Sequence, residues 1–246
     1  MNKLYFVGLL ALASCIEPTG RGCHARALVT FVIDDGSVTD YTVKKPIFDA
    51  HRAVAVSALI STREYLSHDQ LREMQAAGWE IASHTRTHRD LTTLTQSELE
   101  DEIRGSQTEL AARGFNTRTF VYPYGRSNTA VRRIAHTYYR ATARVGGGLN
   151  VWYRHGDADL GRYNFGTRYA LPEQNTMPFY RAQVDAAGST GAWLIYMVHQ
   201  LEGADAQNLG DLLNYIRGQG IPIVTLTQGL DLLECTPTVL ASDRPR

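Results

Sequence analysis

Two aspartates and two histidines have the residue types and spacing of a catalytic metal site. Asp34 and Asp35 end the apolar run ALVTFVI, and His84 and His88 follow a second strand-like segment, WEIAS. Two imidazoles and one carboxylate are a common ligand set for a catalytic zinc ion, with a position left for water. Histidines four apart share a face if their segment is helical. Taken alone, each motif also fits solvated loop residues before a turn.

A third histidine stands at the end of another apolar run. His199 follows WLIYMV, a segment with the composition of a buried strand. A histidine with an ordinary pKa of about 6.5 carries a proton that it can release near neutral pH, so His199 suits a general acid. The alternative is a core histidine satisfied by hydrogen bonds.

These residues need a scaffold that brings strand ends together, and the chain alternates strand and helix patterns. Such alternation is typical of parallel β/α units and not of a sandwich. The expected strands are residues 27–33, 53–60, 79–83, 117–122, 141–145, 167–171, 192–198 and 221–226. The expected helices are residues 68–77, 95–113, 128–139, 208–218 and 228–234. Residues 146–166 are expected to be a long loop at the rim of a substrate cleft.

Four motifs, IDDG, SHTRTH, FVYPYG and IYMVHQ, occur in that order along the chain. They resemble the successive motifs of the polysaccharide deacetylases, the NodB-homology carbohydrate esterases, over residues 27–234. The resemblance implies a distorted or incomplete (β/α)7 barrel in the α/β class. It also implies metal-dependent removal of acetyl groups from an N-acetylglucosamine-containing polysaccharide. The version F-x-Y-P-Y-G is similar to the branch that acts on exopolysaccharides such as poly-N-acetylglucosamine.

The resemblance also assigns roles to individual residues. One divalent ion, zinc with cobalt or nickel as alternatives, is expected on Asp35, His84 and His88. Asp34 would be the general base, His199 the general acid, and the main-chain N–H of Tyr124 a donor to the oxyanion. The expected substrate-binding residues are Tyr122, Pro123, Gly125 and Arg168.

The chain departs from the family pattern at two places. Many members have an arginine at the position of Val121, where it orients the base; Arg162 and Arg168 are the candidate substitutes. The family's Asp-x-x-Asp-Trp motif has no clear match, which leaves Asp157 and Asp159 as candidates for the acid that orients His199.

Other readings remain open at this point. An O-acetyl esterase on xylan or another glycan would use the same residues, because only the leaving atom differs. An amidase on small cyclic amides is a further enzyme reading. A catalytically inactive carbohydrate-binding module is the reading from another class.

The overall charge disfavours a polyanionic partner. Lysines plus arginines number 25 and aspartates plus glutamates 25, so no net field attracts nucleic acid. The expected partner is a polysaccharide or oligosaccharide, bound by a monomer.

The amino-terminal residues predict export to the cell envelope or periplasm. An apolar stretch over residues 4–13 follows Lys3, and LASC resembles a lipobox in which Cys15 is acylated. This gives an export signal over 1–14, a tether over 15–26, one domain over 27–236 and a tail over 237–246. In an oxidising compartment, and because the first and last elements of a barrel are neighbours, Cys23 and Cys235 are expected to form a disulfide.

Overall fold

The computed structural model describes residues 27–147, 149–150 and 158–233 of the chain. Its first strand, β1 (Leu28–Ile33), is buried on both faces. Leu28 and Val32 point into the interior of a barrel, whereas Val29, Phe31 and Ile33 pack outward against helices. This two-sided burial explains the continuous apolar run.

Seven parallel strands form a closed barrel in chain order, and the pairing of β1 with β7 closes it. Besides β1, these are β2 (Val56–Leu59), β3 (Glu80–Ser83), β4 (Thr119–Val121), β5 (Ala141–Val145), β6 (Ala158–Phe165) and β7 (Trp193–Val198). Only Ser83 and Phe120 are paired between β3 and β4. The predicted (β/α)7 barrel is confirmed.

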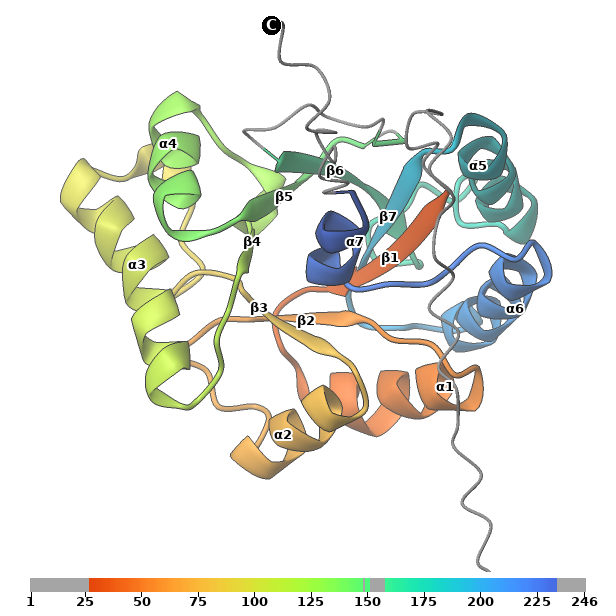
Figure 1. Ribbon diagram of the computed structural model, residues 1–246, viewed down its shortest axis with the longest axis horizontal. Helices are drawn as coiled ribbons and strands as arrows, with labels where there is room; N and C mark the ends of the chain where they lie inside the picture. Colours follow the sequence, from red (N-terminus) through yellow and green to blue (C-terminus); the bar gives the residue numbers. More distant parts are fainter. Residues whose placement is uncertain (1–26, 148, 151–157, 234–246) are drawn as a thin grey trace, which may run out of the picture.

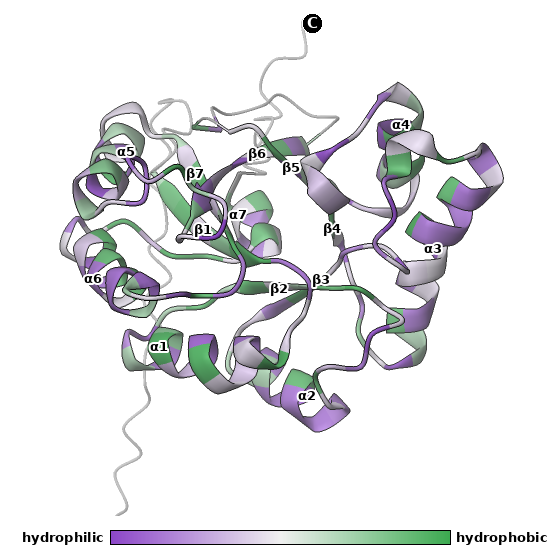
Figure 2. Cartoon of the chain, turned by 180° about the vertical axis from the view of Figure 1, so that it is seen from behind, coloured by the Kyte–Doolittle hydropathy of each residue, from purple (hydrophilic) through white to green (hydrophobic). Residues whose placement is uncertain are grey.

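Helices surround the barrel (Figure 1). They are α1 (Lys45–Ala50), α2 (His68–Ala76), α3 (Gln96–Ala112), α4 (Thr129–Tyr138), α5 (Met177–Thr190) and α6 (Asp205–Gly218). A further helix, α7 (Leu226–Leu233), is not part of this outer layer. α7 lies at the centre of the ring of strands in this view and contributes Leu226 and Leu230 to the interior cluster. Polar residues cover the outward faces of helices such as α2 and α3 (Figure 2).

Helix α3 begins with a capping box, and the expected helix over residues 95–113 is present. The Thr95 hydroxyl accepts from the Glu98 N–H, and the Glu98 carboxylate accepts from the Thr95 N–H. Leu99, Ile103 and Leu110 lie on the buried face of α3.

The structure corrects the expected elements after β5. Strand β6 lies inside residues 146–166, which were predicted to be a loop, whereas residues 167–171 form a turn and not the predicted strand. The predicted strand over residues 221–226 is reduced to one bridge, between Val29 and Ile223. The sequence pattern also gave no indication of α1 and α5.

Several predictions fall on residues outside the described ranges. They concern the export signal, the tether, the tail over 237–246, the lipid anchor on Cys15, and the disulfide between Cys23 and Cys235. No helix in the described part of the chain is long and apolar enough to cross a bilayer.

Candidate active site

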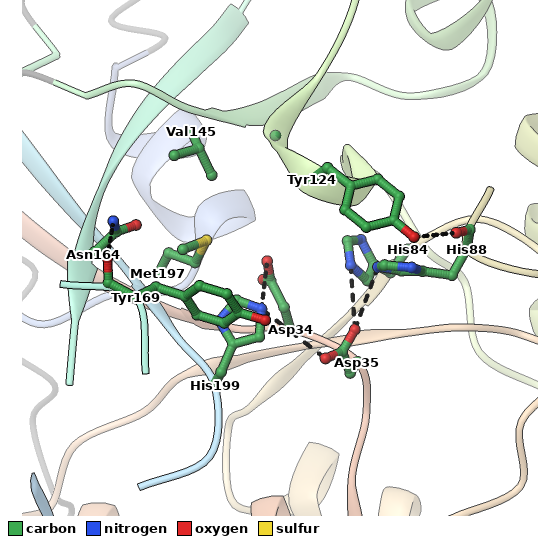
Figure 3. Close-up of a pocket in the computed structure, with 11 residues that line it drawn as sticks. Asp34, Asp35, His84, His88, Tyr124, Val145, Asn164, Tyr169, Met197 and His199 are labelled. Carbon is green, nitrogen blue, oxygen red and sulfur yellow. Dashed lines mark hydrogen bonds and ion pairs between the residues drawn. The ribbon is translucent and has the colours of Figure 1, made fainter. Parts of the chain in front are cut away.

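The predicted catalytic and metal-binding residues converge at the carboxyl end of the barrel. Asp34 and Asp35 follow β1, His84 follows β3, and His199 follows β7. Figure 3 shows the two aspartates between His84 and His88 on one side and His199 on the other. They line a pocket of about 200 Å³ together with Tyr124, Gly125, Val145, Asn164, Tyr169 and Met197.

Asp35, His84 and His88 are arranged to hold one metal ion. One ligand atom from each lies within 4.8 Å of the others, and Asp35 Oδ1 is 3.7 Å from His84 Nε2 and 3.4 Å from His88 Nε2. His84 Nδ1 lies 2.8 Å from the carbonyl oxygen of Val121. A carbonyl only accepts, so Nδ1 carries the proton and Nε2 keeps its lone pair for a metal.

The electrostatic setting of the two histidines also fits a metal. Burial lowers the pKa of His84 to about 4, because the charged form loses its hydration and is repelled by His88. Burial likewise lowers the pKa of His88. Both imidazoles are therefore neutral at pH 7, the form that binds metals. This donor set is the one expected for zinc.

The segment that carries the two histidines, residues 84–88 and here termed the histidine loop, is not helical. The condition under which histidines four apart share a helix face therefore does not apply to His84 and His88. Thr85 has φ of 66° and His88 of 68°, both left-handed, and the Thr85 hydroxyl accepts from the His88 N–H at 2.9 Å. This folded loop brings the two ring centroids to 4.8 Å.

Backbone strain is concentrated around the pocket. Of the five non-glycine residues with positive φ in the described ranges, four belong to the site: Asp35, Thr85, His88 and Tyr124. Each such conformation costs on the order of 1–3 kcal/mol and persists only where surrounding contacts impose it. Gly125 is also required, because a Cβ there would lie 2.3 Å from the Val145 side chain.

Asp34 is held by a buried ion pair with Arg162 of β6. Arg162 Nη1 lies 2.6 Å from Asp34 Oδ1, and the exposed fractions of the two side chains are 0% and 4%. Burial opposes ionisation of Asp34, but attraction to Arg162, His84 and His199 outweighs it and lowers the pKa of the carboxyl. Asp34 is thus an ionised carboxylate at neutral pH, beside the metal ligands and outside their set.

Arg162 and Arg168 were the candidates to replace the arginine that the family pattern has at position 121. The structure pairs Arg162 with Asp34. Arg168 is exposed, and its Nη1 donates to Gln200 Oε1 at 2.6 Å. Arg168 therefore stands at the side of the pocket where His199 lies.

One ring nitrogen of His199, Nε2, faces the two aspartates of the pocket. Its Nε2 is 3.9 Å from Asp34 Oδ2 and 4.0 Å from Asp35 Oδ2. Its Nδ1 is buried and makes no hydrogen bond within the described residues. The ring of Tyr169 packs on the imidazole at 4.4 Å between centroids (Figure 3). Burial lowers the pKa of His199, with Asp34 and Asp35 opposing the shift in part.

Of the two candidate acids for orienting His199, the structure describes only Asp159, whose contacts lie elsewhere. Asp159 accepts from the Thr142 hydroxyl and pairs with Arg144, and Asp157 lies outside the described residues. Within the described residues, the imidazole contacts the ring of Tyr169 and the carboxylates of Asp34 and Asp35.

Tyr124 lies in a short 3₁₀ turn, Pro123–Gly125, at the edge of the pocket. The turn is closed by Gly125 N–H to Tyr122 O and by Arg126 N–H to Pro123 O, and neither bond uses the Tyr124 N–H. Tyr122 and Pro123 are buried, and Tyr122 packs against Phe120 in the core outside the pocket lining. Of the four predicted substrate-binding residues, only Gly125 lines the pocket.

Asn164, Tyr169, Met197 and Val145 are pocket residues that the sequence patterns did not identify. A strand reading of residues 158–165 would have found the first, because side chains alternate along a strand. Leu160 points into the barrel, and Arg162 and Asn164 follow at the same period toward the pocket.

Comparison with known proteins agrees with this geometry. Residues 21–141 match the family model described as polysaccharide deacetylase. The chain is 30% identical over 114 residues to "Putative polysaccharide deacetylase YxkH" of Bacillus subtilis (strain 168). This match covers 44% of the chain and spans only 40% of the length of that relative.

Solved structures share the fold at lower identity. The Xyl-CE4 domain of a multidomain xylanase from the hindgut metagenome of Trinervitermes trinervoides superposes with a TM-score of 0.62 at 18% identity, over 84% of this chain and 90% of that domain. A family 4 carbohydrate esterase from Streptomyces lividans, in complex with acetate, gives 0.61 at 17%, over 81% and 92%.

A family 4 pseudoenzyme from Bacillus anthracis has the same barrel, with a TM-score of 0.62 at 17% identity over 84% of this chain and 66% of its own. The fold alone therefore does not distinguish active from inactive members. The family match and the seven-stranded barrel lead to the same assignment: this chain belongs to the polysaccharide deacetylase family.

Proposed function

We propose that this chain is a metal-dependent hydrolase that removes N-acetyl groups from an N-acetylglucosamine-containing polysaccharide. The observation that carries the proposal is the buried ion pair between Asp34 and Arg162, which lies beside the ligand set Asp35, His84 and His88 in one pocket. A carboxylate kept ionised next to a metal site, without being part of it, has the position of a general base.

The metal ion has a limited and defined part in this proposal. When bound to Asp35, His84 and His88, a divalent ion would supply Lewis acidity, which lowers the pKa of water and polarises the acetyl carbonyl. The donor set favours zinc, with cobalt or nickel as alternatives.

The side chains of the pocket divide the proton transfers between them. Asp34 takes one proton from the attacking water at Oδ2, since Oδ1 is occupied by Arg162. As the new carbon–oxygen bond forms, the Tyr124 N–H donates to the oxyanion. His199 acts in its protonated form: Nε2 gives a proton to the leaving nitrogen while the carbon–nitrogen bond breaks, which leaves a neutral imidazole. The products are acetate and a free amine on the sugar.

O-deacetylation is the second candidate, because one structural neighbour is a domain of a xylanase. The same groups would protonate an alkoxide in place of an amine.

The test is product analysis by mass spectrometry after incubation of zinc-loaded full-length protein. The substrates are chitin oligomers, poly-N-acetylglucosamine, peptidoglycan and acetylxylan. Release of acetate from an N-acetylated glycan supports the proposal. Turnover of acetylxylan alone supports the esterase, and no turnover of any substrate or of a chromogenic acetyl ester, with zinc, cobalt or nickel, supports an inactive binding module.

A further inference from the structure

Helix α3 directs a buried carboxylate at the histidine loop. Glu102 is 2% exposed, and its Oε2 accepts from the main-chain N–H groups of Arg86 at 3.1 Å and Thr87 at 2.9 Å. Its Oε1 accepts from the Thr87 hydroxyl. One side chain of α3 thus accepts from three donors in the middle of the loop, and it shares the Arg86 N–H with the main-chain oxygen of Glu102 at 3.1 Å.

This carboxylate has no cationic side chain as a partner among the described residues. Arg86, whose main-chain N–H donates to Glu102, directs its guanidinium instead at Asp101 at 2.9 Å and Glu109 at 2.6 Å. Burying a carboxylate is unfavourable unless fixed donors replace its hydration. Here the donors are mostly main-chain N–H groups, so the position of the carboxylate and the conformation of the loop determine each other.

The other side of the loop is held by the segment after β2. The carbonyl oxygen of Thr85 accepts from the Ser61 N–H at 3.1 Å, and that of Arg86 accepts from the Thr62 N–H at 3.2 Å. Glu102 is therefore the group that satisfies the N–H side of a segment whose two left-handed residues need outside support.

The two histidines depend on this support to different degrees. His84 continues directly from β3 and is fixed by the Val121 carbonyl. His88 lies at the far end of the loop, so its ring reaches Asp35 and His84 only when the loop keeps its fold.

We propose that Glu102 is a positioning residue that preorganises the histidine loop, so that His88 faces Asp35 and His84 before a divalent ion binds. The inference rests on the proposed function only in that these three residues bind such an ion. A ligand ordered in advance loses less conformational freedom on binding, and loss of groups that orient metal ligands typically weakens affinity about 10- to 100-fold.

The experiment measures zinc affinity of the full-length, metal-free protein by competition with a chromogenic chelator. Glu102→Gln keeps the size of the side chain, but replaces one acceptor oxygen by a donor that faces the loop. Zinc affinity is expected to fall by about 10- to 100-fold. The rate constant kcat should be reduced at limiting zinc and recover at saturating zinc, which simple loss of folded protein would not produce.

Two further variants make the result specific. Glu100→Gln alters the same helix at a carboxylate that accepts from Tyr138, and should leave zinc affinity unchanged. Thr87→Val removes only the hydroxyl donor, and should weaken zinc binding less than Glu102→Gln. Circular dichroism before the titration confirms that each variant is folded, and Thr87→Val provides the measurement if Glu102→Gln does not fold.

The outcomes separate the two proposals. Wild-type zinc affinity in Glu102→Gln, or in Thr87→Val if that is the variant that folds, would overturn the role of Glu102 and leave the proposed function intact. Failure of the wild-type protein to bind zinc would overturn both the metal site and the role of Glu102.

Discussion

Arg162 and Asp34 are separated by 128 residues in the chain and by 2.6 Å between Nη1 and Oδ1 in the fold. The family resemblance implies an arginine partner for this aspartate at the position of Val121, which is buried in the interior cluster. Strand β6 supplies the guanidinium from another direction. Asp34 therefore has a cationic partner in this chain although position 121 is a valine.

Replacing this arginine should impair the base without emptying the metal site. In Arg162→Gln the pKa of Asp34 rises, because burial then opposes ionisation without a compensating cation. The acidic limb of the kcat/KM profile should move to higher pH, and breaking a buried pair should cost about 3–5 kcal/mol of folding free energy. Measurement of the pH profile and of zinc content checks both statements.

Arg168→Gln is the matched control for that experiment. Arg168 contacts Gln200 and not Asp34. Its replacement should not shift the acidic limb of the kcat/KM profile, even if the value of KM changes. An equal shift in both variants would show that the limb does not report on the ion pair.

Replacing a metal ligand and replacing the general base should have different effects on zinc content. His84→Ala and His88→Ala each remove a ligand, so both zinc retention and activity should be lost. Asp34→Asn removes only a proton acceptor, so zinc should remain at wild-type stoichiometry while the rate falls by about 10²- to 10⁴-fold. Elemental analysis of purified variants decides this, and a zinc-free Asp34→Asn protein would refute the division of labour between the two aspartates.

The sequence patterns predicted the strands whose side chains are apolar on both faces, and failed where polar residues replace them. Residues 27–33 and 192–198 read as strands because barrel interior and helix-facing layer are both apolar. β6 did not, because Arg162 and Asn164 face the catalytic pocket and interrupt the pattern. Local rules fail at functional sites for this reason.

The histidine loop is a second case of this kind. The spacing H-x-x-x-H is correct for two ligands of one metal, but it does not specify the backbone between them. That conformation depends on Glu102 and on Ser61, and therefore on contacts with α3 and with the segment after β2. Contacts of this kind cannot be read from the motif.

Metal-free protein should lose stability as the pH falls from about 6.5 to about 4. The pKa of His84 is about 4 in the fold and about 6.5 in the unfolded chain, so the unfolded state binds more protons in this window. The stabilisation is complete above pH 6.5, and His84 alone should account for a loss of roughly 2 kcal/mol between pH 7 and pH 5.

Urea denaturation of chelator-treated protein at pH 7 and pH 5 measures this loss. His84→Gln should show a smaller difference between the two pH values, with a remainder from His88 and His199, whose pKa values are also lowered by burial. An unchanged pH dependence in His84→Gln would show that His84 is not buried in its neutral form.

Tyr169 should affect the rate through His199. The Tyr169 ring packs on the His199 imidazole, whose Nδ1 has no hydrogen-bond partner among the described residues. The main-chain carbonyl oxygen of Tyr169 accepts from the Asn164 side chain. Tyr169→Ala should lower kcat by about tenfold because the imidazole is no longer held, whereas Tyr169→Phe keeps the packing and most of the rate. Zinc content should be the same in both. Equal rates for Ala and Phe would remove Tyr169 from the account of catalysis.

The last prediction concerns the two cysteines that flank the barrel in sequence. The described ends of the domain are close: the Val29 N–H donates to Pro222 O at 3.0 Å, and the Val224 N–H donates to Val29 O at 2.9 Å. Cys23 precedes β1 by a few residues and Cys235 follows α7, so in an exported protein we predict a disulfide between them, with Cys15 left for lipid. Closing so long a loop would stabilise the domain by about 4–5 kcal/mol in the chain-entropy model. Non-reducing peptide mapping of protein from the cell envelope should recover the crosslinked pair, and alkylation of both cysteines without prior reduction would contradict the bridge and weaken the prediction of export.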